Sequence, residues 1–239
     1  MKTSVNAYTI IIDPGHGGND KGAVYGPAQE SHIVFDISKA LKKLLEENHY
    51  TVTMTRQKDQ FVSLQKRVEV SQNQSADLFV SLHANASEDK RARGIEFFLQ
   101  APQNSNSFVH KVSKTDSMLF NNSIENEQAS LSKKEDIKKI VSELAQNIKI
   151  KRSLLLSSQL KKELPGVIKQ APFYVLTKTE VPSVLIEVGF LSHPKENKKL
   201  LTKTYQSEVA QKIFSSLQRF SAKSEFQGNS LDEKAEIPR

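Results

Sequence analysis

The sequence of 239 residues contains no cysteine and no tryptophan. Without cysteine the chain can form no disulfide bond, no zinc–thiolate site and no cysteine nucleophile. No apolar run approaches the roughly 20 residues that span a bilayer, so we expect no transmembrane segment. Any transition metal that this chain binds must therefore be held by histidine and carboxylate side chains.

The remaining composition is that of a folded globular protein, with 37% hydrophobic and 26% charged residues. Most of the net charge of +7 lies between residues 133 and 170, where ten basic residues stand against four acidic ones. This stretch contains no aromatic residue, although a nucleic-acid-binding surface is expected to combine the two kinds. We therefore expect no nucleic acid as a partner. Exposed faces of amphipathic helices explain the charge better than the alternative, an acidic partner.

The apolar patterns predict strands and helices that alternate along the chain. Strands are predicted at 9–12, 50–55, 77–82, 94–99, 173–176 and 183–188, and helices at 31–45, 64–70, 137–148, 154–164 and 205–220. Such alternation is typical of an α/β fold, here a single domain with a twisted, mostly parallel β-sheet flanked by helices on both faces. We place this domain at residues 8–220, with an α-helical insertion at about 104–150. A polar tail at 221–239 is expected to be disordered.

Polar residues mark three of the predicted strands. His16 follows the first strand, His83 stands at the end of the third, and Glu187 lies within a strongly apolar late strand. In an open α/β sheet the loops that leave the carboxyl ends of the strands meet at one crevice. Glu30 near the start of the first helix can be brought back to His16 by the glycine-rich loop between them. Two imidazoles and a carboxylate would then form a zinc site with an open fourth position.

Each of these residues also has a purely structural explanation. A histidine after a strand is often a capping or core residue, and Glu30 could serve only the positive N-terminus of its helix. Glu187 could belong to a buried ion pair. A nucleotide-binding loop is excluded, because no Gly-Lys-Ser/Thr follows the glycines. Four other histidines, which have no carboxylate at a recognisable spacing, are expected at the surface or in loops: His32, His49, His110 and His193.

Four separated motifs make the sequence similar to one known family. They are IDPGHGG at 12–18, followed by Asp20 and by Glu30 at the start of a helix, then DLFVSLHANA at 77–86, RGIE at 93–96 and PSVLIEVGFLS at 182–192. Together they resemble the zinc-dependent N-acetylmuramoyl-L-alanine amidases of the cell-wall amidase 3 family. The resemblance extends over about residues 9–220.

The resemblance implies that His16, Glu30 and His83 bind one Zn²⁺ per chain. It also implies that Glu187 is the catalytic glutamate, which takes a proton from the attacking water and delivers it to the leaving amine. The implied reaction is hydrolysis of the amide bond between N-acetylmuramic acid and L-alanine in peptidoglycan. This activity would serve cell-wall remodelling or the separation of daughter cells.

Further residues are candidates for other roles. Asn85, Arg56 and Arg67 stand close to the motifs and are candidates for substrate binding, with a structural salt bridge as the alternative for both arginines. The insertion at 104–150 resembles a region where one subgroup of the family carries a regulatory helix, which covers the active site until an activator protein displaces it. By position, Glu125 or Glu127 would then occupy the open position of the zinc. An ordinary solvated surface segment is the alternative.

Two other functions stay open at this stage. One is another zinc amidohydrolase acting on cell-wall material, and the other is a catalytically inactive peptidoglycan-binding scaffold of the same fold. The N-terminus carries no secretory signal, which fits a cytoplasmic protein or a mature exported domain. Because peptidoglycan lies outside the cytoplasmic membrane, we expect a periplasmic or otherwise extracytoplasmic location. We also expect a monomer.

Overall fold

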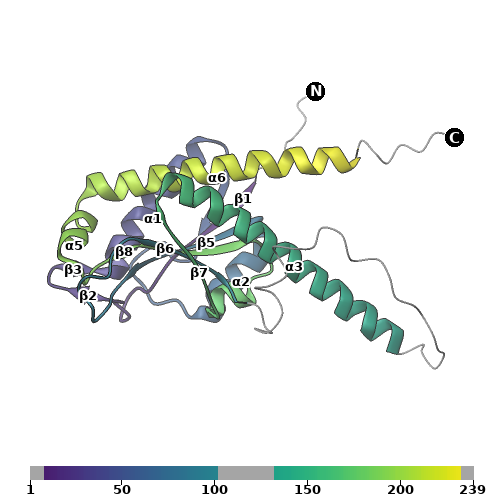
Figure 1. Cartoon of the computed structure of the whole chain (residues 1–239), viewed down its shortest axis with the longest axis horizontal. Coiled ribbons are helices and arrows are strands. Elements are labelled where there is room, and N and C mark those ends of the chain that lie inside the picture. Colours follow the sequence, from purple (N-terminus) through teal and green to yellow (C-terminus); the bar gives the residue numbers. More distant parts are fainter. Residues whose placement is uncertain (1–7, 102–131, 233–239) are drawn as a thin grey trace.

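A six-stranded sheet with helices on both faces forms the body of the protein (Figure 1). The structure is a computed structural model that describes residues 8–101 and 132–232. The strands are β1 (Thr9–Pro14), β2 (Val24–Tyr25), β3 (Ala28–Gln29), β4 (Thr51–Met54), β5 (Leu78–Asn85), β6 (Ile95–Gln100), β7 (Gly166–Ala171) and β8 (Ser183–Phe190). The helices are α1 (Glu30–Glu47), α2 (Leu64–Asn73), α3 (Ser132–Glu163), α4 (Tyr174–Lys178), α5 (Pro194–Leu200) and α6 (Lys203–Asp232).

The strand order of the main sheet is β4-β1-β5-β8-β6-β7. The first four of these strands run parallel to one another, β6 runs antiparallel to β8, and β7 runs parallel to β6. The predicted mostly parallel α/β sheet is therefore confirmed. Because β1, β5 and β8 are parallel neighbours, their carboxyl ends meet at one edge, which is where ligand sites form in such sheets.

Apolar side chains from alternate strand positions build two cores, one on each face of the sheet. The larger core contains Ile10 and Ile12 of β1 together with residues of α1, α3 and α6, such as Leu41, Leu156 and Ile213. The smaller core on the opposite face gathers residues of β1, β5 and β8 with residues of α2 and α4: Ile11, Val68, Phe79, Val175 and Leu185. Strands that are buried on both faces explain the continuous apolar runs in the sequence.

The predicted strand at 173–176 is wrong, and a strand at Gly166–Ala171 was missed. In the first segment the neighbours Val175 and Leu176 are both buried while Phe173 and Tyr174 are exposed, which is the pattern of a helical turn and not of a strand. The missed strand is β7 at the edge of the sheet. Its sequence is short and partly polar and follows Pro165, so it shows no apolar run that would indicate a strand. A residue larger than glycine at position 166 would bring its Cβ within 2.5 Å of the Ile95 carbonyl oxygen.

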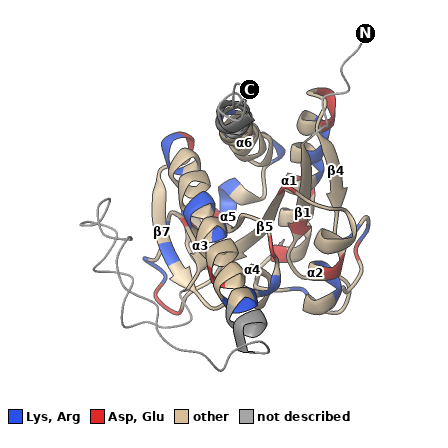
Figure 2. Cartoon of the chain, turned by 90° about the vertical axis from the view of Figure 1, so that its right-hand side faces the viewer, with Lys and Arg blue, Asp and Glu red and all other residues tan. Residues whose placement is uncertain are grey.

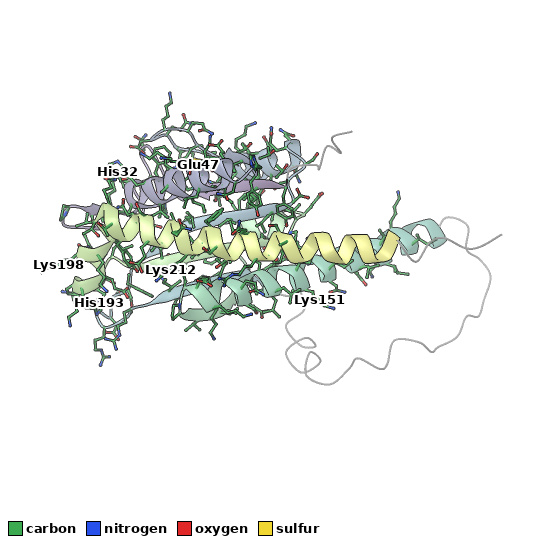
Figure 3. The ribbon with its side chains drawn as sticks, turned by 90° about the horizontal axis from the view of Figure 1, so that it is seen from above. His32, Glu47, Lys151, His193, Lys198 and Lys212 are labelled. Atoms are coloured by element: carbon green, nitrogen blue, oxygen red, sulfur yellow. The ribbon has the colours of Figure 1, made fainter. Side chains whose placement is uncertain are left out.

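The helices predicted at 137–148 and 154–164 form one continuous helix, α3. Its N-terminal half extends beyond the sheet (Figures 1 and 3), and its predicted apolar face is not buried. Five apolar side chains of this half are each more than half exposed: Ile137, Ile140, Val141, Leu144 and Ile148. Lysine and arginine residues recur along the same helix (Figure 2).

Lys149 marks the point at which α3 begins to pack on the sheet. Its ammonium group is buried and donates to Gln100 Oε1 at 2.7 Å, to the Leu176 carbonyl at 2.6 Å and to the Thr179 carbonyl at 2.5 Å. Burial lowers the pKa of Lys149 to about 8, although Glu180 acts in the opposite direction. From here on, α3 is joined to the end of β6 and to α4.

The last helix was predicted to end at residue 220, but α6 continues to Asp232.

Within the described ranges, no helix combines the length and the apolar character needed to cross a membrane.

Candidate metal centre

The loop after β1 and the end of β5 bring two histidines together. Pro14 of β1 lies beside Leu82 of β5 in the parallel register, so the residues that follow both strands leave at the same edge of the sheet. His16 adopts a positive φ of 58°, an uncommon conformation for a residue other than glycine. This conformation turns the chain sharply, and the ring centroids of His16 and His83 lie 5.0 Å apart.

Glu30, the first residue of α1, completes the group. Its Oε1 lies 3.1 Å from His16 Nε2 and 2.9 Å from His83 Nδ1. One possible ligand atom from each of His16, Glu30 and His83 lies within 4.8 Å of the others, as a shared metal ion requires. The structure thus brings together the three residues that the sequence predicted as ligands.

Two glycines allow the close approach of these side chains. A Cβ at Gly22 would lie 2.5 Å from Glu30 Oε2 and 2.6 Å from His16 Cδ2. A Cβ at Gly15 would lie 2.3 Å from His83 Cε1. These glycines therefore serve the site by leaving room for its side chains, in addition to turning the chain.

Hydrogen bonds fix the orientation of the three side chains. Asp20 Oδ1 lies 2.9 Å from His16 Nδ1, which leaves Nε2 of the same ring directed at the site. The two oxygens of Glu30 accept hydrogen bonds from the main-chain amides of Ala23 and Ala84. Such outer contacts hold ligands in place for a metal.

The charges of the group are strongly coupled. Burial acts to lower the pKa of His16, but the hydrogen bonds and charges of Glu30 and Asp20 outweigh it and raise that pKa to about 8. Burial alone would raise the pKa of Glu30, yet the hydrogen bonds from His16 and His83 hold it well below the usual carboxylate range. Glu30 is therefore an anion, which is the ionisation state a metal ligand needs.

Glu187 lies next to this group on β8. In the strand register it stands directly beside His83 of β5 on one side and beside Glu96 of β6 on the other. Burial raises the pKa of Glu187 to about 7, with Glu30 and Glu96 acting in the same direction and His83 against them. Its Oε2 is buried and has no hydrogen-bond partner. The alternative of a buried ion pair is not supported, because none involves Glu187 among the residues that the structure describes.

A pocket of about 290 Å³ opens onto these residues. His16, His83 and Glu187 line one part of it, together with Asp20. Two imidazoles and one carboxylate are a donor set of catalytic metal sites in which one position stays open. Buried polar atoms in proteins normally have a hydrogen-bond partner, so we expect a polar group next to the unpartnered oxygen of Glu187 in this pocket. The residues present therefore fit a divalent metal ion with a water or substrate oxygen next to Glu187.

The two arginines considered for substrate binding are buried under the His16 loop. Arg67 donates to Asp13 Oδ1 at 2.7 Å and to the carbonyl oxygens of Pro14 and His16. Arg56 donates to the carbonyl oxygens of Pro14, Gly15 and Ser31, and burial together with the charge of Arg67 lowers its pKa to about 10. Arg67 thus forms the structural salt bridge given as its alternative, with Asp13, whereas the bonds that the structure shows for Arg56 go to main-chain carbonyl oxygens.

Asn85 and the remaining candidates have different positions. Asn85 Nδ2 donates to Glu96 Oε2 at 3.2 Å. Glu125, Glu127 and His110 lie outside the described residues. His32 and His193 are both on the outside of the molecule (Figure 3). His32 Nε2 lies 3.4 Å from Oδ2 of Asp59, a carboxylate at no recognisable sequence spacing from it.

Three residues that support the site were named in the sequence motifs without a role of their own. Asp20 orients His16, Asp13 pairs with Arg67, and Glu96 lies beside Glu187. A signal existed for Asp20, because it lies four residues after His16 in a glycine-rich loop. Asp13 and Arg67 are 54 positions apart in the sequence, so no local sequence pattern predicts their ion pair.

Comparison with known proteins identifies relatives over nearly the whole chain. Residues 10–219 match the family described as N-acetylmuramoyl-L-alanine amidase. The chain is 33% identical over 230 residues to the N-acetylmuramoyl-L-alanine amidase AmiC of Escherichia coli, covering 89% of this chain and 52% of that protein. It is 31% identical to AmiA of Escherichia coli, covering 89% and 75% of the two chains. The chain thus spans about half the length of AmiC and three quarters of AmiA.

A solved structure of similar fold comes from Clostridioides difficile. The CwlD amidase in complex with the GerS lipoprotein aligns with a TM-score of 0.67 at 26% identity. The alignment covers 90% of this chain and 98% of CwlD.

Proposed function

The chain belongs to the N-acetylmuramoyl-L-alanine amidase family, and from this premise we propose that it hydrolyses the amide bond between N-acetylmuramic acid and L-alanine in peptidoglycan. Zn²⁺ is the proposed cofactor, held by His16, Glu30 and His83. The observation that carries the proposal is the group of these three side chains beside Glu187, whose buried Oε2 lacks a hydrogen-bond partner.

Each residue has a defined task in the proposed reaction. A bound zinc ion would lower the pKa of its water toward about 7 and would polarise the amide carbonyl. Glu187 accepts the proton of the attacking water and delivers it to the leaving amine. The burial that raises the pKa of Glu187 to about 7 matches this exchange, because a group with a pKa near the working pH can both accept and return a proton.

Digestion of purified peptidoglycan tests the proposal. We expect intact stem peptides and bare glycan strands as products, and loss of activity on chelation that added zinc restores. Shortened stem peptides would indicate a carboxypeptidase, and free acetate a deacetylase. Binding without any cleavage, both by the zinc-loaded protein and by its variant that lacks residues 121–134, would favour the inactive scaffold and contradict the proposal.

We propose an extracytoplasmic location, because the proposed substrate lies outside the cytoplasmic membrane. There the enzyme would serve cell-wall remodelling or the separation of daughter cells. Fractionation of the native host with an antibody against the chain tests the location, and detection in the cytoplasm alone would contradict it.

We further propose that the insertion at about 104–150 regulates the enzyme and that an activator protein acts on it. Support comes from the exposed apolar side chains of α3, since an apolar helix face in water is typical of an interaction surface. CwlD, one of the structural relatives, is found in complex with a lipoprotein. Deletion of residues 121–134 should raise the basal activity, and an unchanged rate would contradict autoinhibition, including a role for Glu125 or Glu127.

A further inference from the structure

The pocket has a second part that the proposed chemistry does not use. Besides the histidines and carboxylates, its lining includes apolar residues that come from two segments far apart in the sequence. Phe61 and Leu64 belong to the start of α2 and the segment before it, and Phe173 and Tyr174 to the start of α4. All four side chains are exposed, Phe61 to 62% and Tyr174 to 41%. We call Phe61, Phe173 and Tyr174 the aromatic walls.

Two of the aromatic walls, Phe61 and Phe173, belong to segments that pack closely on the rest of the protein. The main chain at Phe61 packs against the His16 loop so closely that a Cβ at Gly18 would lie 2.6 Å from the Phe61 nitrogen. Asp59 accepts a hydrogen bond of 2.8 Å from the Gly18 amide in the same contact. On the other side, the Phe173 ring packs edge to face on Phe98, with centroids 5.2 Å apart. An exposed ring that is fixed as Phe173 is loses little freedom when it binds a ligand.

The charges of the pocket decide which part of the substrate suits the aromatic walls. The charged residues in the lining, apart from the histidines, are Asp13, Asp20, Arg67 and Glu187. Arg67 is buried and its guanidinium is already bound to Asp13 and main-chain carbonyls. The lining therefore offers no free cation to the carboxylates of a stem peptide. An uncharged group with an apolar face fits better.

We propose that the aromatic walls form a subsite for the sugar ring of the muramoyl group, which packs its C–H face against Phe61 and Tyr174. The proposal rests on the proposed amidase function and adds a binding site to it. The faces of aromatic rings are electron-rich and attract the weakly positive hydrogens of a C–H surface. A pyranose ring has such a surface and carries no charge once its lactyl carboxyl group is joined to the peptide. The enzyme would thus recognise the glycan side of the bond through these rings.

Two substrates with the same scissile bond test this subsite. One is a muropeptide that contains the muramoyl ring, and the other is the matching peptide that carries only the D-lactyl group. The measured quantity is the ratio of kcat/KM for the muropeptide to kcat/KM for the lactyl peptide. Phe61→Leu and Tyr174→Leu keep an apolar side chain but remove the ring, so each should lower this ratio about five- to tenfold.

Conservative variants and a surface control complete the experiment. Phe61→Tyr and Tyr174→Phe keep the rings and should keep the ratio within about twofold of the wild-type value. Leu201→Ala removes an exposed apolar side chain outside the pocket and should leave the ratio unchanged. Because Phe61 and Tyr174 are exposed, the leucine variants should melt within a few degrees of the wild type.

The outcomes separate the two proposals. A wild-type ratio in the leucine variants would overturn the sugar subsite, and so would an equal loss on both substrates. The proposed function itself would be overturned if neither the zinc-loaded wild-type protein nor the zinc-loaded variant that lacks residues 121–134 cleaves either substrate.

Discussion

The His16 loop and the N-terminal half of α3 distribute their side chains in opposite ways. Under the loop, two arginines and Asp13 are buried, and their polar atoms bind one another and main-chain carbonyls. Along the first half of α3, apolar side chains face solvent over several turns. One region buries charge and the other exposes apolar surface, and both arrangements cost free energy in an isolated protein.

The difference indicates what each region does. A buried, fully paired polar network fixes a unique geometry, which a metal site with a tolerance of a few tenths of an ångström needs. An exposed apolar helix face gains nothing by itself and becomes favourable only when another surface covers it. These properties agree with the roles proposed above, chemistry for the first region and binding for the second.

The largest effect is expected from Glu187→Gln, which removes the proposed proton acceptor and keeps the shape of the side chain. We expect kcat on peptidoglycan to fall about a thousandfold or more, while the zinc content stays at about one ion per chain. His83→Ala should instead lose both zinc and activity. Activity close to wild type in Glu187→Gln, or full zinc content in His83→Ala, would contradict the assigned roles.

The next effect concerns the network under the His16 loop. Arg67→Met leaves the buried Asp13 carboxylate without its cation, and we expect a loss of about 3 kcal/mol in the free energy of unfolding. The control is Arg91→Met, whose ion pair with Asp89 is exposed to solvent and should contribute no measurable stability. Chemical denaturation measures both. Equal losses would mean that burial of the network does not matter.

A third prediction concerns pH. Burial raises the pKa of Glu187 from 4.5 to about 7, so the folded chain binds this proton more tightly than the unfolded chain. The resulting stabilisation is fully present at pH values below 4.5 and is lost as the pH rises through about 7. Metal-free Glu187→Gln should therefore gain on the order of 2 kcal/mol relative to metal-free wild type between about pH 4 and pH 8. A pH-independent difference in denaturant unfolding would contradict the raised pKa.

The smallest effect is expected on the exposed half of α3. The double variant Ile140→Ser and Leu144→Ser should change the free energy of unfolding by less than about 0.5 kcal/mol for each substitution, because both side chains are mostly in solvent. Leu156→Ala, on the same helix but fully buried, should cost about 2–5 kcal/mol. A large loss in the double variant would show that this face is covered in the isolated protein.

The metal-ligand group could be predicted from the sequence because parallel strands obey a simple rule. His16 and His83 each follow a buried apolar run, and neighbouring parallel strands end at one edge of the sheet. The approach of Glu30 to His16 could be predicted because the glycines between them indicate a turn. The residues that hold these ligands were harder to find, since the pairing of Asp13 with Arg67 depends on how α2 packs on the sheet.

The errors in the fold come from short or exposed elements. β7 has one covered face at most and lies at the sheet edge, so its sequence lacks the apolar run that marked β1 and β5. The segment Tyr174–Lys178 is too short for helical periodicity to appear. The apolar spacing at 137–148 predicted a helix correctly, but periodicity alone cannot tell a buried face from an exposed one.

The enclosed ammonium group of Lys149 has a consequence for chemical labelling of the surface. Amine-reactive reagents should modify exposed lysines of α3 such as Lys138 and Lys151 quickly, while Lys149 is shielded by Gln100, Leu176 and Thr179. The rate at which Lys149 becomes labelled then measures how often this part of α3 leaves the sheet. A single lysine thus reports the attachment of the helix in the native protein, without any substitution.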